Sequence, residues 1–154
     1  MACIPIHCSA VSVVIIRETS NGHQVLLLRR NHTLVGEWCQ IAGGIEDGET
    51  AWQTALREVK EETGLVCQHL YSADICEQFY EADRNAISML PVFVGFVDAA
   101  ADVTINEEHS EFRWVSFTKA LTMVPFPQQR RVLRHIEADF VQSSPSNHLP
   151  IETL

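Results

Sequence analysis

The sequence predicts an α/β protein built as one domain, in which strands and helices alternate along the chain. Short apolar runs rich in β-branched residues recur, and two segments have the apolar spacing of amphipathic helices. The chain has 154 residues, of which 46% are hydrophobic, and this is enough for a single core. No internal repeat and no long linker divides it. We therefore expect one sheet with helices on both faces.

The first predicted element is a β-hairpin. Residues 11–16 and 24–30 are apolar runs with the length and composition of strands. Between them lies Thr-Ser-Asn-Gly at residues 19–22, a sequence that favours a turn. Residues 31–37 carry polar side chains and a glycine, so we expect a loop after the hairpin.

A short strand, a turn and a helix are predicted next. Residues 38–42 form the strand, which leads into a tight turn at the glycine pair 43–44. Thr50 is a suitable N-cap for a helix over residues 51–63. Gly64 follows as the residue that ends this helix in the left-handed conformation.

Three further strands, a second helix and a tail complete the prediction. Residues 67–79 and 87–97 are expected to be strands, and a shorter one is expected over residues 112–115. A helix over residues 126–141 carries apolar residues at i, i+4 and i+8, which is the spacing of a helix that packs on a core. Residues 142–154 are polar and interrupted by prolines. We expect them to be a mobile tail after a domain that spans residues 1–141.

The helix predicted over residues 51–63 concentrates negative charge on one face. Glu58, Glu61 and Glu62 are spaced i, i+3 and i+4, so they share one face while small apolar residues share another. At roughly 6 Å, two such carboxylates repel by about 3 kcal/mol at an effective dielectric constant of about 20. A fully solvated helix tolerates this repulsion, but a partly enclosed one needs a cation. Oxygen ligands alone favour Mg²⁺ or Mn²⁺.

The segment that contains this helix also resembles a known motif. Its defined positions, in order, are Gly43-x5-Glu49-x7-Arg57-Glu58-Val59-x-Glu61-Glu62-x-Gly64-Leu65. This pattern matches the Nudix box at every defined position, and the flanking residues 26–30, Trp38 and 111–115 also resemble the family. The chain is therefore similar to the Nudix hydrolases, which cleave a nucleoside diphosphate linked to another moiety. The resemblance implies an α/β/α sandwich around a mixed β-sheet, the Nudix fold.

The resemblance also implies a divalent-metal site. In relatives the matching glutamates bind one or more ions, and the first also takes part in catalysis. Carried over, Glu58 is the candidate general base or base-side ligand, and Glu61 and Glu62 are ligands. The carbonyl of Ala42 or Gly43 is a further candidate ligand. A bound Mg²⁺, with Mn²⁺ as a possible substitute, neutralises phosphate oxygens and lowers the pKa of a bound water.

Arg57 and Glu49 are expected to support this site. Arg57 has a simple alternative as a surface partner of Glu61 at i, i+4, worth only a few tenths of a kcal/mol. The family role, which we favour, is to hold Glu58 or Glu49 by charge-assisted hydrogen bonds and so to assist catalysis. Glu49 is then an orienting residue or an occasional ligand.

One more acidic residue is expected from the segment before Trp114. Relatives often supply an additional metal-binding or catalytic glutamate from this region. The sequence offers Glu107, Glu108 and Glu111. We favour Glu108, six residues before Trp114, as ligand and catalytic residue, with Glu111 in reserve. Acids on loops are also commonly just solvated.

Four residues are candidates for substrate binding. Gly43 and Gly44 lack a Cβ and allow the backbone to approach a phosphate, although a glycine pair is often only a turn. Arg29 and Arg30 end a strand and point to opposite faces, so at most one faces the site. We favour Arg30 for a phosphate contact, with a solvated strand end as the alternative. Trp38 is a candidate for stacking on a base, or else part of the core.

The composition limits the kinds of ligand and partner that we expect for this protein. The net charge is −9, and no basic stripe is present, so polymeric nucleic acid is not an expected ligand. The five cysteines form no Cys-x-x-Cys pair and indicate reduced thiols. The amino terminus lacks a basic leader, and no apolar run reaches membrane-spanning length. We expect a cytoplasmic monomer or homodimer with a small substrate and no membrane partner. The seven histidines show no ligand spacing, and none is assigned to catalysis.

The expected function is a metal-dependent pyrophosphohydrolase in which water attacks phosphorus of a nucleoside triphosphate or a related substrate. Dihydroneopterin triphosphate and dinucleoside polyphosphates are alternative substrates, and Tyr80, sixteen residues after Gly64, has a spacing similar to hydrolases of the latter. An alternative from another class is a non-catalytic ligand-binding regulator with the same fold. Such proteins commonly lose glutamates of the box, whereas this chain keeps them. A decapping-type enzyme is disfavoured by the negative charge.

Overall fold

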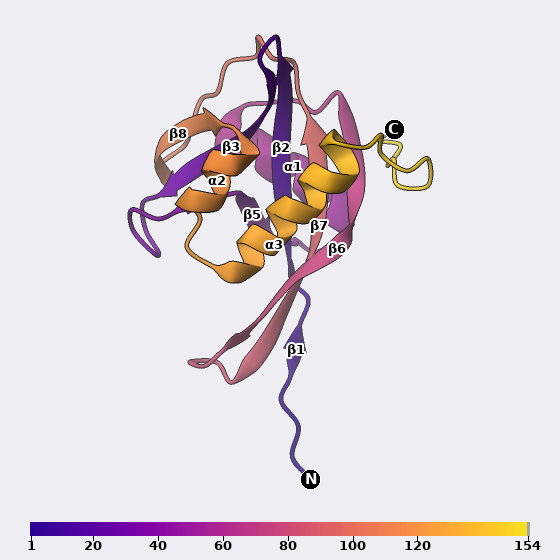
Figure 1. The fold of residues 1–154 in the computed structure, drawn as a ribbon. Coiled ribbons are helices and arrows are strands. Elements are labelled where there is room, and N and C mark those ends of the chain that lie inside the picture. Colours follow the sequence, from indigo (N-terminus) through magenta and orange to yellow (C-terminus); the bar gives the residue numbers. More distant parts are fainter. Residues whose placement is uncertain (154) are drawn as a thin grey trace.

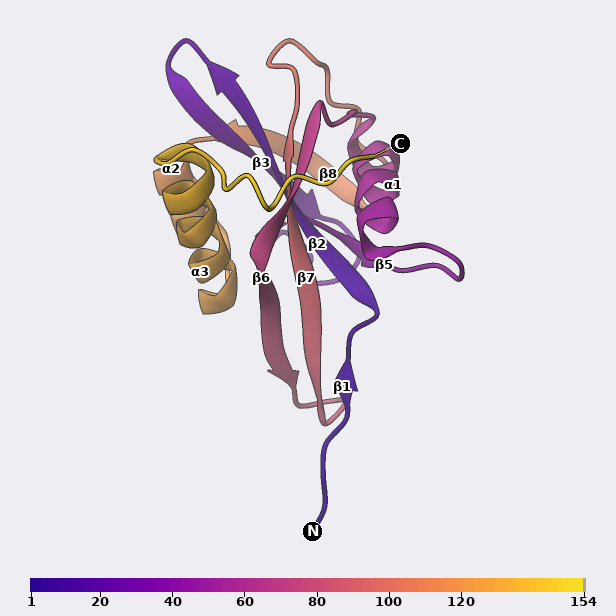
Figure 2. The same cartoon turned by 90° about the vertical axis from the view of Figure 1, so that its right-hand side faces the viewer.

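The computed structural model describes residues 1–153 and confirms the α/β/α sandwich. Within these residues, eight strands form one mixed sheet. Helix α1 covers one face, and α2 and α3 cover the other (Figures 1 and 2). The strands are β1 (Ile6–His7), β2 (Ala10–Thr19), β3 (Gly22–Arg30), β4 (Trp38–Cys39), β5 (Ile41–Gly44), β6 (His69–Glu81), β7 (Ala86–Phe96) and β8 (His109–Val115). The helices are α1 (Ala51–Thr63), α2 (Phe117–Met123), α3 (Pro127–Ile136) and a π-helical turn, η1 (Glu137–Val141).

Strand β2 lies at the centre of the sheet and is buried on both faces. It pairs in parallel with β7 and antiparallel with β3 and β5. Because side chains alternate along a strand, Val13 and Ile15 pack in the core beneath α1, whereas Val14 and Ile16 pack in the core beneath α2 and α3. A strand buried on both faces has a continuous apolar sequence, which explains the run that predicted it.

Helix α1 has the boundaries and caps that the sequence predicts. The Thr50 hydroxyl accepts a hydrogen bond from the Gln53 amide at 3.2 Å, and the Gln53 side chain accepts one from the Thr50 amide at 2.8 Å. Gly64 is left-handed, with φ of 71°, and its amide donates to the Lys60 carbonyl at 2.9 Å. Ala55 and Val59 are buried against the sheet. The opposite side of the helix is thus left for the acidic residues.

The predicted turn at residues 43–44 is wrong. Both glycines belong to β5, where Gly43 pairs with Val11 and Gly44 with Ala10 of β2. The turn comes later, where the Glu49 amide donates to the Glu46 carbonyl at 3.0 Å and Gly48 has φ of +84°. The long antiparallel partner β2 holds the glycine pair in an extended conformation, which a local turn propensity cannot reveal.

The carboxyl-terminal third differs from the prediction in the start of one strand, in an additional helix and in the division of the last helix. β8 begins at His109, three residues before the predicted start at 112, because its pairing with β3 continues as far as Arg30. The short helix α2 was not predicted; Ser116 caps it by accepting from the Lys119 amide at 3.1 Å. The predicted helix over residues 126–141 is divided into α3 and the π-helical turn η1.

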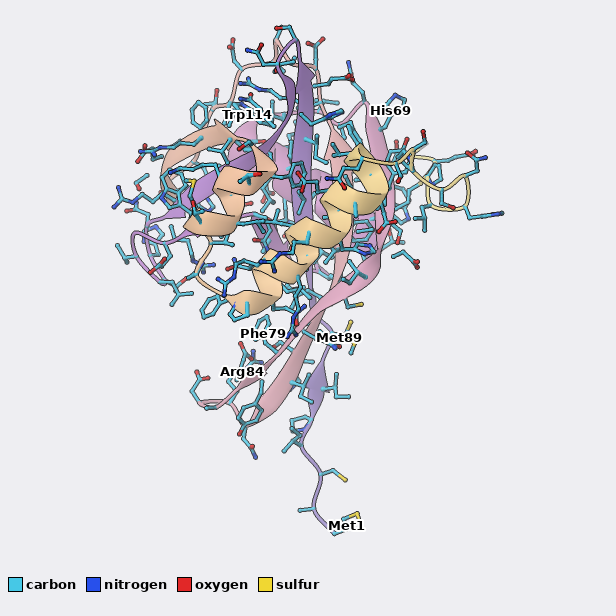
Figure 3. All side chains as sticks on the ribbon, in the orientation of Figure 1. Met1, His69, Phe79, Arg84, Met89 and Trp114 are labelled. Carbon is cyan, nitrogen blue, oxygen red and sulfur yellow. The ribbon has the colours of Figure 1, made fainter. Side chains whose placement is uncertain are left out.

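Two peripheral segments complete the fold. The β6–β7 hairpin projects beyond the helices, with Arg84 at its end (Figure 3). After η1 the chain returns along β6, where the Ser72 amide donates to the Leu149 carbonyl at 3.0 Å and the Ile151 amide donates to the Leu70 carbonyl at 2.8 Å. The domain boundary at residue 141 stays a prediction. No helix within residues 1–153 has the length and apolar character needed to cross a bilayer.

Candidate metal and catalytic site

Glu62, in the last turn of α1, lines an open cavity of about 300 Å³. The cavity is bounded by the ends of β3, β4, β5 and β8 and by the last turn of α1. Its lining includes Arg30, Gln40, Ala42, Glu62, Glu108 and His109. Residues that are far apart in the sequence therefore meet here, and most of them are polar.

The three glutamates of α1 have different environments. Glu62 is 3% exposed and Glu58 is 9% exposed, whereas the side chain of Glu61 is 55% exposed. Glu62 and Glu58 lie on the side of the helix that faces the sheet edge, and Glu61 lies toward solvent. The three residues are therefore close together on the helix but do not share one environment, and burial ranks them in a way that the sequence alone did not.

Arg57 connects three of the acidic residues around the helix. Its Nε and Nη2 donate to the two carboxylate oxygens of Glu49 at 2.8 and 2.9 Å. Its Nη1 donates to Glu58 Oε1 at 2.8 Å and to Glu61 Oε2 at 3.2 Å. Nη2 also donates to the Gly44 carbonyl at 2.8 Å. The guanidinium thus does far more than pair with Glu61, and it ties α1 to the strand before it.

The pKa values of the two acids held most tightly by Arg57 move in opposite directions. Hydrogen bonds from Arg57, supported by the Glu46 amide, lower the pKa of Glu49 to about 2. For Glu58, burial raises the pKa, and the hydrogen bond from Arg57 only partly opposes this. Glu49 is therefore a permanent anion, whereas Glu58 is closer to the condition required of a proton acceptor near neutral pH.

Gly43 is required by the position of Glu58. A Cβ at Gly43 would overlap the carboxyl group of Glu58, so only glycine leaves room for that side chain. A Cβ at Gly44 would meet nothing nearer than the Ser9 carbonyl oxygen at 3.9 Å. The two adjacent glycines therefore have different roles, although both were predicted to allow close approach of a phosphate.

A second cluster, which we call the cavity cluster, consists of Glu62, Glu108 and His109. One potential ligand atom from each lies within 4.8 Å of the others. Among residues 1–153, Glu62 Oε2 and His109 Nδ1 are buried polar atoms with no hydrogen-bond partner. Burial and, next, a hydrogen bond with Glu108 raise the pKa of Glu62 to about 9. Buried unpaired polar atoms are costly, and a divalent cation would satisfy both, so these residues fit a metal ion.

The predicted extra acid can be compared with its neighbours. Glu108 is exposed and lines the cavity beside Glu62. Glu111 lies instead between Arg113, at 3.1 Å, and Arg29, at 3.6 Å. The structure thus brings Glu108, and not Glu111, to the cavity cluster. The catalytic role of Glu108 stays a prediction.

The predicted substrate-binding side chains are divided between the cavity and the surface. Arg30 lines the cavity, where its guanidinium donates to the carbonyl of Thr33 at 2.8 Å and to the Thr33 hydroxyl. Trp38 packs against the core and is covered by the guanidinium of Arg113, 5.0 Å from the ring centroid. Arg30 is thus placed to meet an anionic group, whereas Trp38 is occupied by other protein contacts.

Sequence reasoning assigned no site role to His32, Thr33, Cys39, Gln40 and His109, which also line the cavity. Gln40 donates to Ser12 at 3.0 Å and to Glu77 at 2.8 Å, and accepts from Gln129 at 3.2 Å. It links the cavity wall to a buried polar network under α3. His109 was passed over because no second histidine stands at ligand spacing. Its position directly after Glu108 was the one available signal.

The relation of the chain to known proteins agrees with this geometry. A family model described as the NUDIX domain matches residues 7–136. The octanoyltransferase of Myxococcus xanthus is 32% identical over 130 residues, which cover 83% of this chain but only 36% of that protein. The asymmetrical bis(5′-nucleosyl)-tetraphosphatase of Caenorhabditis elegans is 27% identical over 131 residues, which cover 84% of this chain and 94% of that protein.

A solved structure agrees with the fold. The structure of a NUDIX hydrolase from Listeria monocytogenes superposes with a TM-score of 0.73 and 26% identity, and the match covers 87% of this chain and 94% of that one. The family and fold expected from the sequence are thereby confirmed. The family match covers most of the sequence and includes the whole glutamate-rich motif. The chain therefore belongs to the NUDIX domain family, the family of the Nudix hydrolases.

Proposed function

We propose that this protein is a divalent-metal-dependent pyrophosphohydrolase that splits a phosphoanhydride bond of a nucleoside triphosphate or a related nucleotide by attack of water on phosphorus. The observation that carries the proposal is the pair of buried unpaired atoms, Glu62 Oε2 and His109 Nδ1, in a polar cavity beside Glu58. Such atoms are retained at a binding site more readily than in a merely structural core. Family membership supplies the reaction class.

Different residues of the site have different proposed roles in metal binding, proton transfer and phosphate binding. Glu62 and Glu108 are the candidate ligands in the cavity, with Glu58, Glu61 and the Ala42 carbonyl as further candidates from the Nudix motif. A bound Mg²⁺ or Mn²⁺ would neutralise phosphate oxygens and acidify a water molecule. Because Glu58 Oε1 already accepts from Arg57, Oε2 is left to accept a proton from the attacking water. Arg30 at the cavity wall supplies positive charge for a phosphate.

The substrate class is proposed on two grounds. A net charge of −9 requires that a polyphosphate be attracted locally, by the metal and by Arg30, which favours a small substrate over polymeric nucleic acid. The nematode relative is named for a dinucleoside tetraphosphate, so dinucleoside polyphosphates are a second candidate, and dihydroneopterin triphosphate a third. We expect a cytoplasmic monomer or homodimer.

A panel assay tests the proposal. Release of phosphate and pyrophosphate is measured with nucleoside triphosphates, dihydroneopterin triphosphate, dinucleoside polyphosphates, ADP-ribose and NADH, each with Mg²⁺ or Mn²⁺. We expect turnover of at least one triphosphate, loss of activity with excess chelator, and recovery when metal is restored. Full turnover in chelator would reject the mechanism. Tight binding of a nucleotide without any turnover across the panel would favour a ligand-binding regulator.

A further inference from the structure

His109 is the feature of the cavity for which the proposed chemistry does not yet account. It is the first residue of β8, it is 9% exposed, and its Nδ1 has no hydrogen-bond partner among the described residues. The pairing of β8 with β3 shifts register between Arg29 and Arg30, so that Arg30 pairs with His109 while Arg29 pairs with Glu111. This irregularity places His109 and Arg30 side by side at the strand ends that border the cavity.

The contacts of the imidazole indicate which nitrogen is free. His109 Nε2 lies 4.0 Å from Cys39 Sγ. The Cys39 thiol donates to the Leu28 carbonyl at 3.6 Å, so its sulfur lone pairs are available to accept from the ring. Nε2 then carries the hydrogen, and Nδ1 keeps its lone pair. In metal-binding histidines, the hydrogen bond that one ring nitrogen donates commonly leaves the other ring nitrogen free to bind the metal.

The His109 ring lies beside the carboxylates of Glu62 and Glu108. One ligand atom each from Glu62, Glu108 and His109 lies within 4.8 Å of the other two. With bonds of about 2.1 Å, two ligand atoms of one ion are at most about 4.2 Å apart. Only a small closure of the cluster would therefore be needed. Glu62, whose Oε2 is also buried and unpaired, belongs to the same cluster.

We propose that His109 binds the divalent ion directly through Nδ1, together with Glu62 and Glu108, and that this nitrogen ligand favours Mn²⁺ and other first-row transition ions over Mg²⁺. The inference rests on the proposed function, because it concerns the metal of the same site. Mg²⁺ strongly prefers oxygen ligands, whereas imidazole binds transition ions well. A site of carboxylates alone would show a smaller difference between the two ions.

Electron spin echo spectroscopy of bound Mn²⁺ tests this directly. The metal-free protein is titrated with Mn²⁺, and the modulation from a directly bound ¹⁴N is recorded. We expect the nitrogen modulation in the parent protein and its replacement by a ¹⁵N pattern when the protein carries ¹⁵N-labelled histidine. This labelling needs no substitution, so the outcome does not depend on whether a variant folds.

Two variants assign the nitrogen to a residue. His109→Gln keeps a polar group near the position of Nε2 but removes Nδ1. It should lose the modulation and bind Mn²⁺ about tenfold or more weakly, with a smaller change for Mg²⁺. His32→Gln is the matched control, because His32 also lines the cavity but lies outside the cavity cluster. It should keep the modulation.

The possible failures are distinguishable. Mn²⁺ that binds in a Glu62-dependent manner without nitrogen modulation would overturn the role of His109 and leave the pyrophosphohydrolase proposal intact. Loss of the modulation in His32→Gln, with retention in His109→Gln, would also overturn it. No binding of Mn²⁺ or Mg²⁺ at millimolar concentration would overturn both proposals.

Discussion

The two acidic groups at this site are organised in opposite ways. Glu49, Glu58 and Glu61 each accept a hydrogen bond from the Arg57 guanidinium, and a backbone carbonyl accepts another. In the cavity cluster, Glu62 and His109 each keep a buried atom without a partner among residues 1–153. The first group is held together by hydrogen bonds, which fix the positions of its side chains. The second is incomplete and is suited to receive a cation.

The pKa shifts express the same difference. Arg57 lowers the pKa of Glu49 to about 2, whereas burial raises the pKa of Glu62 to about 9. Glu49 lies just before α1 and Glu62 lies in its last turn, so the two residues are at opposite ends of the same helix. Glu49 is therefore ionised because it is paired with the Arg57 guanidinium. Glu62 keeps its proton because it is buried without a cation.

The largest expected effect comes from Glu58, which Arg57 holds and which lies close enough to Glu62 and Glu108 to interact with their charges. Glu58→Gln should lower turnover about 10²–10⁴-fold, as is usual for loss of a positioned general base. Glu108→Gln should cost less, and Glu107→Gln should cost least, because Glu107 does not line the cavity. Steady-state kinetics at saturating Mg²⁺ measure all three. Near-parental turnover in Glu108→Gln with a large loss in Glu111→Gln would contradict the assignment of the extra acid.

Alanine substitutions at Gly43 and Gly44 test whether Glu58 requires a glycine at residue 43 in particular. Gly43→Ala places a methyl group where the Glu58 carboxyl now lies, so it should displace that side chain, destabilise the fold by about 1–3 kcal/mol and lower turnover. Gly44→Ala has free space around the added methyl group and should melt close to the parent. Thermal unfolding of both variants checks this. Equal destabilisation of the two would show that Glu58 does not depend on Gly43.

Arg57→Lys tests the contribution of the Arg57 hydrogen bonds to stability. The depressed pKa of Glu49 contributes stability that is present above the unfolded-state pKa of about 4.3 and is lost as pH falls toward about 2. A lysine cannot reproduce the forked hydrogen bonds, so the variant should be less stable at neutral pH. The gap to the parent should narrow as pH falls through this window. Chemical denaturation at several pH values measures the gap, and a constant gap would contradict the role given to Arg57.

The smallest expected effect on stability has the opposite sign. The raised pKa of Glu62 means that the folded, metal-free protein holds a proton that the unfolded chain releases above about pH 4.3. Its stability should therefore fall as pH rises from there toward 9. Glu62→Gln removes this loss and should be more stable than the parent by about 1–2 kcal/mol near pH 8 without metal.

Two controls complete the comparison at Glu62. Turnover of Glu62→Gln should fall by orders of magnitude, since a proposed ligand is lost. Added Mg²⁺ should stabilise the parent more than the variant, because binding to the folded state alone raises stability. A variant that melts much earlier than the parent yet keeps its activity would favour a structural role for Glu62.

Local sequence patterns account for the elements that depend on residues close together along the chain. The hairpin from β2 and β3 follows from apolar runs around a turn, and α1 follows from its capping residues and from Gly64. The acidic face of α1 follows from helical periodicity, and the spacing of the glutamate-rich motif was specific enough to identify the family. These features depend on residues within a few turns of one another, so a linear pattern contains them.

The surroundings of those elements depend instead on contacts between residues that are far apart in the sequence. The extended conformation of Gly43 depends on pairing with β2, and the meeting of Glu62 with Glu108 and His109 depends on the register of β8 against β3. Some of the glutamates accept hydrogen bonds from Arg57 and Glu62 does not, and this difference depends on which carboxylates the Arg57 side chain contacts. Burial and long-range pairing set these outcomes. Desolvation and Coulomb energies depend on distances in space, which the order of residues along the chain does not specify.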